Sequence, residues 1–171
     1  MLYSELQCSE AIHKAVERMG FAEMTEIQEK TIPVMLAGHD VIAKAPTGTG
    51  KTCAFGIPVA EHIQPENKYP QAVIMAPTRE LAQQIAEELS NLTYFMPEVQ
   101  VACVYGGANM EKQAKRLAEG CQIVVATPGR LMDHYKHHSI DISHVTQIVL
   151  DEADEMLNMG FYKDVRHIIE L

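Results

Sequence analysis

Five short apolar segments recur along the chain, at intervals that leave room for a helix between consecutive segments. They are rich in β-branched residues and span 41–43, 72–76, 99–105, 122–127 and 147–152. Strands that are covered on both faces have this composition, so the segments predict a parallel sheet. The stretches between them show helical spacing of apolar residues, as in 81–92. This alternation predicts an α/β fold with helices on both faces, in which ligands bind beyond the carboxyl ends of the strands.

The composition is that of a soluble globular domain. Apolar residues make up 47% of the 171 residues and charged residues 22%, which supports one domain with a sizeable core. No apolar run could cross a bilayer, and the first residues do not resemble a secretory signal, so we expect a cytoplasmic protein without a membrane partner. The net charge of −9 argues against a broad basic face for nucleic acid. Backbone amides at helix N-termini remain available as phosphate ligands.

The cysteines and the clustered histidines lack the spacing of a metal site. The cysteines are Cys8, Cys53, Cys103 and Cys121. No two of them are as close as in a metal knuckle or a redox motif, so free thiols are expected. The histidines are His134, His137, His138 and His144. Because no ligand pattern supports them, we expect them to lie at a solvated helix end.

The segment 45–52 follows the first apolar run and opens a predicted helix. It consists of Ala45, Pro46, Thr47, Gly48, Thr49, Gly50, Lys51 and Thr52. Its two glycines let the backbone turn so that N–H groups face phosphate oxygens. Lys51 supplies a positive charge for the outer phosphates, and the Thr52 hydroxyl can reach Mg²⁺. A phosphate-binding P-loop usually begins with glycine rather than Ala45, so this segment alone leaves open a glycine-rich turn that precedes Lys-Thr by coincidence.

A second chemical motif, Asp151-Glu152, ends the last apolar run. Two carboxylates at the end of a buried strand are costly unless a cation or a reaction uses them. Asp151 is placed to hold Mg²⁺ through water, and Glu152 to orient and deprotonate an attacking water. An acidic helix N-cap is the alternative, because negative charge is favoured there. With the glycine-rich loop, the pair predicts Mg²⁺-dependent hydrolysis of ATP or GTP.

The chain resembles the first RecA-like domain of DEAD-box ATP-dependent RNA helicases. Residues 151–154 spell Asp-Glu-Ala-Asp, the motif that names the family, and the family's P-loop begins with alanine, as Ala45 does here. The resemblance spans the chain from Tyr3 onward and implies a RecA-like P-loop domain over 1–171 that binds ATP and Mg²⁺. It also implies that Asp154 couples this domain to a second one.

Three further motifs carry the resemblance, each directly after a predicted strand. Their residues are Pro77, Thr78, Arg79, Gly106, Gly107, Thr127, Pro128, Gly129 and Arg130. In the family these motifs hold single-stranded RNA by its sugar-phosphate backbone, which implies RNA binding with little sequence preference. The hydroxyl and guanidinium groups present are suitable phosphate ligands. A surface ion pair is the alternative for each of the two arginines.

The segment 20–28 is similar to the family's Q motif. The resemblance implies that the Gln28 amide reads adenine, that Phe21 belongs to the motif, and that Tyr3 stacks on the base. Met24 stands where the family usually has proline, which affects the rigidity of the loop but not the amide. Thr25 and Gln28 also have the spacing of a helix capping box, and the sequence does not separate this role from adenine recognition.

The resemblance also implies what the chain lacks. No Ser-Ala-Thr occurs in the sequence, so we expect the chain to stop before the strand that carries this motif and before a second RecA-like domain. The fragment alone should then bind nucleotide weakly and hydrolyse almost none. It should also be less stable than a longer version or associate through the exposed edges of its sheet. A non-catalytic RNA-clamping scaffold and a P-loop ATPase that acts on a non-RNA partner are the alternative functions.

Overall fold

The structure is a computed structural model that describes residues 2–39, 51–160, 163, 166, 168 and 169. The predicted strand 41–43 and the loop residues 45–50 lie outside the described residues. The chain divides into two compact units, Met1–Ile63 with Glu88–Pro97 and Gln64–Glu87 with Glu98–Leu171, and each unit is described by itself. Within the described residues, no helix combines the length and the apolar composition that a membrane-spanning segment requires.

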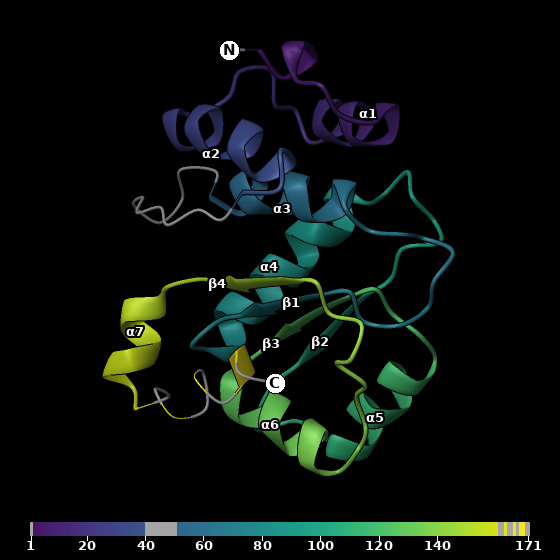
Figure 1. Cartoon of the computed structure of the whole chain (residues 1–171), viewed down its shortest axis with the longest axis vertical. Helices are drawn as coiled ribbons and strands as arrows, with labels where there is room; N and C mark the ends of the chain where they lie inside the picture. Colours follow the sequence, from purple (N-terminus) through teal and green to yellow (C-terminus); the bar gives the residue numbers. More distant parts are fainter. Residues whose placement is uncertain (1, 40–50, 161–162, 164–165, 167, 170–171) are drawn as a thin grey trace. The chain divides into compact units, whose positions relative to one another are not determined.

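The second unit contains a sheet of four parallel strands in the order β2-β3-β1-β4 (Figure 1). The strands are β1 (Ala72–Met75), β2 (Val101–Val104), β3 (Ile123–Ala126) and β4 (Gln147–Leu150). Met75 at the end of β1 pairs with Ala126 on β3 and with Leu150 on β4. The four strands therefore end at one edge of the sheet, as the sequence predicted, and the loops that follow them share that edge.

The connections between the strands place helices on both faces of this sheet. These helices are α4 (Arg79–Leu92), α5 (Met110–Ala118) and α6 (Pro128–Lys136). A further helix, α7 (Ala153–Asn158), follows β4. The connection from β1 to β2 crosses the sheet in one direction, and the next two connections cross it in the other. Right-handed crossovers therefore put the start of α4 on one face and both α5 and α6 on the opposite face. Figure 1 shows α5 and α6 on the same side of the sheet. The predicted α/β class is confirmed.

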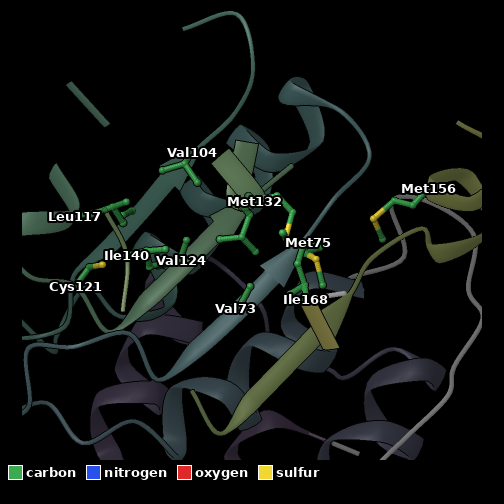
Figure 2. Close-up of a cluster of buried hydrophobic side chains, with 13 residues drawn as sticks. Val73, Met75, Val104, Leu117, Cys121, Val124, Met132, Ile140, Met156 and Ile168 are labelled. Atoms are coloured by element: carbon green, nitrogen blue, oxygen red, sulfur yellow. The ribbon is translucent and has the colours of Figure 1, made fainter. Parts of the chain in front are cut away.

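A buried apolar cluster fills the face that α5 and α6 cover (Figure 2). Alternate strand residues contribute to it because successive side chains of a strand point to opposite faces. It includes Val73, Met75, Ala102, Val104, Leu117, Val124, Ala126, Leu131, Met132 and Met156. Strand residues of the other parity, such as Ile74 and Val125, are also fully buried. β4 differs, because Ile148 is 42% exposed and β4 is an edge of the sheet formed by the described strands.

The first unit is helical. It contains a short 3₁₀ helix, η1 (Tyr3–Glu5), followed by α1 (Glu10–Arg18), α2 (Glu26–Leu36) and α3 (Lys51–Glu61). Helices α2 and α3 pack against each other. A Cβ added at Gly56 would lie 2.8 Å from Cδ1 of Leu92, so α3 passes close to the last turn of α4. This close approach depends on the missing side chain of glycine.

Candidate functional site

The predicted acidic pair lies at the end of β4. Asp151 is 5% exposed, and its backbone N–H donates to the carbonyl oxygen of Met75 at 2.9 Å. Glu152 is the N-cap residue of α7 in a left-handed backbone conformation, with φ 52° and ψ 52°, and its side chain makes no capping hydrogen bond. Glu152 thus stands at the helix N-terminus that the alternative reading predicts, without the side-chain hydrogen bond of a cap. A buried carboxylate next to a second one is an oxygen donor set suited to a hard divalent cation.

Two residues of the predicted phosphate loop are described. Lys51 and Thr52 begin α3, and both are half-buried. The predicted helix after the loop is thus present, and its first turn directs backbone N–H groups toward the preceding loop. Ala45, Pro46, Thr47, Gly48, Thr49 and Gly50 lie outside the described residues. Lys51 and Thr52 belong to the first unit, and Asp151 and Glu152 belong to the second.

The first predicted RNA motif connects β1 to α4. Pro77 is buried, and the Thr78 hydroxyl oxygen accepts the backbone N–H of Leu81 at 3.2 Å, which caps the helix. Arg79 is exposed, and its guanidinium carbon lies 4.7 Å from the ring centroid of Tyr105. In the described part of the chain, Arg79 makes no ion pair. Its contact with Tyr105, which follows β2, joins the first motif to the second.

The second predicted RNA motif is the glycine pair after β2. Gly106 and Gly107 are exposed, and Gly107 has a φ of 82°, a conformation that favours glycine. The loop ends at Asn109, whose side-chain oxygen accepts the backbone N–H of Lys112 at 3.0 Å and caps α5. The glycines therefore expose backbone groups between an aromatic residue and a helix N-terminus.

The third predicted RNA motif connects β3 to α6. Thr127 is the N-cap residue of α6, but its side chain makes no capping hydrogen bond, and its backbone N–H donates to Val104 at 3.1 Å. Pro128 is buried in the first turn, and a Cβ added at Gly129 would meet nothing within 4 Å. Thr127 and Gly129 thus follow β3 at the sheet edge that the other two loops share.

Arg130 makes contacts within the protein rather than a simple surface ion pair. Its Nη1 donates to the carbonyl oxygen of Ala108 at 3.0 Å and to Oε1 of Gln113 at 3.1 Å. Its Nε lies 3.7 Å from a carboxylate oxygen of Asp133, and the Arg130 side chain is only 13% exposed. Gln113, which is 8% exposed, was not among the predicted site residues. Its helical position gave no signal beyond that of a polar residue.

His134 corrects one sequence prediction. We expected the four clustered histidines at a solvated helix end, but His134 is fully buried on α6, with Nε2 3.0 Å from Oε1 of Gln113. His137 and His138, at the end of α6, are exposed as expected, and so is His144. The expectation was wrong for His134 because helical spacing from Leu131 places it on the inward face. No metal-binding group of three ligands occurs in the described residues, in which the four cysteines are free thiols.

The predicted adenine motif lies in the first unit. Gln28 is 2% exposed and forms a complete capping box with Thr25, whose backbone N–H donates to Oε1 of Gln28 at 2.9 Å. The Tyr3 hydroxyl donates to the same oxygen. The ring of Tyr3 stacks on that of Phe21, with centroids 6.3 Å apart. Burial, together with the neighbouring Cys53, raises the pKa of Tyr3 well above its usual value, so its hydroxyl stays protonated and donates.

The sequence matches the family model described as DEAD/DEAH box helicase over residues 25–171. The chain belongs to the DEAD/DEAH box helicase family. This membership confirms the resemblance stated from the motifs. It also agrees with the RecA-like arrangement of the sheet and with the Asp-Glu pair at the end of β4.

Individual members of the DEAD/DEAH box helicase family match almost the whole chain. It is 52% identical over 170 residues to "ATP-dependent RNA helicase CshA" of Limosilactobacillus reuteri, covering 99% of this chain and 34% of that protein. It is 44% identical to "ATP-dependent RNA helicase DeaD" of Escherichia coli, covering 98% and 27% respectively. A crystal structure of a DEAD box protein from Methanococcus jannaschii superposes with a TM-score of 0.91 at 41% identity, covering 99% of this chain and 46% of that one. The chain thus spans about a third of the length of the curated relatives it matches.

Proposed function

We propose that this chain is the ATP- and RNA-binding domain of a cytoplasmic ATP-dependent RNA helicase. In the whole protein it would couple ATP hydrolysis to the unwinding of RNA duplexes, together with a second RecA-like domain. The observation that carries the proposal is the shared sheet edge. Three predicted RNA loops and the Asp151-Glu152 pair all follow parallel strands that end in register. Family membership and relatives named ATP-dependent RNA helicases support it.

The nucleotide would be bound by residues of the first unit. Residues 45–52 would surround the phosphates, with Lys51 as the positive charge, and Gln28, Tyr3 and Phe21 would contact adenine. Mg²⁺, when bound, would neutralise charge on the outer phosphates. Thr52 would hold it directly and Asp151 through water. The burial of Asp151 fits this role, because burying a carboxylate is costly unless a cation or hydrogen bonds compensate for the lost solvent.

Glu152 would orient the attacking water and accept its proton. Its left-handed backbone turns the chain between β4 and α7, and its side chain makes no capping hydrogen bond to the helix. Asp154, in the first turn of α7, would couple the site to the second domain. Arginines from that domain raise the rate of phosphoryl transfer by roughly 10³–10⁵ in related enzymes. The chain alone should therefore bind ATP weakly and hydrolyse almost none.

RNA would be bound through its backbone, by the loops after β1, β2 and β3. Contacts to phosphate and sugar carry no sequence information, so little sequence preference is expected. The exposed backbone at Gly106 and Gly107, the half-buried backbone at Gly129 and the N-termini of α4, α5 and α6 would supply uncharged donors. This mode of binding is compatible with the net charge of −9.

The experiment that tests this function is RNA-stimulated ATP hydrolysis by a protein that carries this chain within the length of its relatives. Single-stranded RNA should raise the ATPase rate, and duplex DNA should not. Stimulation by a non-RNA partner alone would support the alternative P-loop ATPase. RNA binding without any ATP hydrolysis would support the scaffold alternative.

A further inference from the structure

The side-chain amide of Gln113 lies in the middle of a buried hydrogen-bond network in the second unit. Its Nε2 donates to the backbone carbonyl oxygen of Tyr105 at 3.0 Å. Its Oε1 accepts from Nη1 of Arg130 at 3.1 Å and lies 3.0 Å from Nε2 of His134. An arginine can only donate and a backbone carbonyl can only accept, so these partners fix the orientation of the amide.

The same partners fix the protonation of His134. Because Oε1 of Gln113 carries no hydrogen, Nε2 of His134 must donate to it. Nδ1 is buried without a hydrogen-bond partner in the described part of the chain, and a proton there would be an unsatisfied buried donor, so Nδ1 is the unprotonated nitrogen. His134 therefore sits as a neutral imidazole with a defined tautomer, which keeps the amide of Gln113 in place.

The network reaches both sides of the glycine pair in the second motif. Tyr105 immediately precedes Gly106, and its carbonyl oxygen accepts from Gln113. Ala108 immediately follows Gly107, and its carbonyl oxygen accepts from Arg130 at 3.0 Å. Two successive glycines have no side chains to restrict their backbone. The loop conformation is therefore held from outside, through the two flanking carbonyl groups.

We propose that Gln113, Arg130 and His134 form a buried brace that sets the conformation of the Gly106–Gly107 loop for RNA backbone binding. Within the brace, Arg130 is a positioning residue instead of a phosphate ligand, which replaces the role that the family resemblance implied for it. Nη1 of Arg130 donates to two protein acceptors, and its Nε faces Asp133. Arg79 is exposed over Tyr105 and keeps its predicted phosphate contact. This inference rests on the proposed RNA-binding function.

The salt dependence of RNA binding separates a positioning arginine from a phosphate ligand. Each phosphate contact made by a cation adds about 0.7 to the slope of log affinity against log salt for single strands. We would titrate this chain with a fluorescent oligouridylate at several salt concentrations. Gln113→Met and Arg130→Met should each weaken RNA binding by roughly tenfold, because each variant removes one member of the buried hydrogen-bond network. Neither variant should change the slope. Arg79→Met is the matched control and should reduce the slope by about 0.7.

The double variant Gln113→Met/Arg130→Met completes the test. Because both residues act through one loop, its loss of affinity should be close to that of either single variant instead of the product of both. Gln113→Glu keeps the acceptor for Arg130 and should restore part of the affinity. If Arg130→Met reduced the salt-dependence slope by about 0.7 and Gln113→Met bound RNA like the parent, the proposal would be overturned in favour of a direct phosphate contact by Arg130.

Amide hydrogen exchange at Gly106 and Gly107 keeps this test independent of RNA. Gln113→Met and Arg130→Met should speed exchange at both glycines relative to the parent chain, and Arg79→Met should not. Unchanged exchange would overturn the brace. Faster exchange in a chain that does not bind the oligouridylate would leave the brace standing and contradict the proposed RNA-binding function instead.

Discussion

The hydroxyl of Tyr3 donates a hydrogen bond to the side-chain carbonyl oxygen of Gln28, and the backbone N–H of Thr25 donates to the same oxygen. A carbonyl oxygen has two lone pairs, so both acceptor positions of Gln28 are used. The two roles that the sequence left open for Gln28, helix capping and adenine recognition, therefore both involve its Oε1 atom. The capping box is present, and adenine recognition would require the amino group of the base to replace the Tyr3 hydroxyl.

Gln28→Ala should lower both stability and adenine selectivity. The loss of the cap costs on the order of 1 kcal/mol, and the loss of the buried hydrogen bond from the Tyr3 hydroxyl adds about 0.5–1.5 kcal/mol. Urea denaturation would measure the stability, and titration with ATP and GTP the selectivity. A stability loss with unchanged selectivity would show that Gln28 acts only as a cap.

Tyr3→Phe is the matched variant, because it removes the hydroxyl and keeps the ring. The capping box with Thr25 remains, and Oε1 of Gln28 becomes available to the base. We expect ATP to bind at least as tightly as in the parent, and GTP to remain excluded. If ATP affinity fell in Tyr3→Phe as far as in Gln28→Ala, the hydroxyl would be part of base binding rather than a competitor for it.

Lys51→Ala and Glu152→Gln should separate binding from chemistry. In a protein that carries this chain within the length of its relatives, Lys51→Ala should weaken ATP binding itself, since it removes the charge that faces the outer phosphates. Glu152→Gln should bind ATP and RNA together but turn over very slowly, since the amide cannot accept a proton from water. Equilibrium binding and single-turnover hydrolysis would measure the two steps. A parental hydrolysis rate in Glu152→Gln would exclude Glu152 as the base.

His134 should make the fold less stable at mildly acidic pH. Burial lowers its pKa below the usual 6.5; Arg130 and His137 add to this shift, and Asp133 opposes it. Below pH 6.5 the unfolded chain then binds a proton that the folded chain does not. The free energy of unfolding therefore falls as pH decreases from about 6.5 toward the pKa of the folded state, by at most about 1.4 kcal/mol per pH unit.

Urea denaturation between pH 8 and pH 5 measures this effect of His134. His134→Gln should flatten the dependence of stability on pH in that range, because it removes the titrating group. His144→Gln, which changes an exposed histidine stacked on Tyr69, is the matched control for the loss of an imidazole side chain. A parental slope in His134→Gln would mean that other groups cause the acid sensitivity.

Ile148→Lys should reduce self-association of this chain. β4 pairs only with β1 among the described strands, and Ile148 is 42% exposed beside an apolar groove. Exposed apolar strand edges recruit other chains, and a lysine there opposes such pairing. Stability should change by less than about 0.5 kcal/mol, as for most exposed positions. Light scattering against concentration would measure association, and equal scattering by parent and variant would show that this edge is not the contact.

The sequence predicted the sheet well because its signal is local. Four apolar runs became β1 to β4, all parallel, with shorter bounds than the runs themselves. The helical spacing in 81–92 became α4. Each pattern arises from the burial of residues within one segment, and the spacing of apolar residues along that segment indicates which of them are buried.

The site was predicted less completely, because its contacts join residues distant in sequence. Gln113 and His134 meet across 21 positions, and Gln28 meets Tyr3 across 25. No spacing rule relates such pairs, so His134 was expected at the surface and Gln113 was not considered. The capping box of Gln28 was foreseen because its partner Thr25 lies three residues away. The strand 41–43 and the loop residues 45–50 lie outside the described residues, and their predicted roles stay predictions.

The left-handed backbone of Glu152 has a consequence for any search for more stable variants. In this conformation a residue with a Cβ costs roughly 1–2 kcal/mol of stability relative to glycine. The melting temperature of Glu152→Gly should therefore be higher than that of Glu152→Ala. Inside a helix the order of the two variants is reversed. Both variants lack the carboxylate that would accept the proton from water. A selection for thermal resistance would therefore accept glycine at this position, whereas a selection for turnover would reject it. Retaining glutamate there means keeping a local conformational cost in exchange for reactivity.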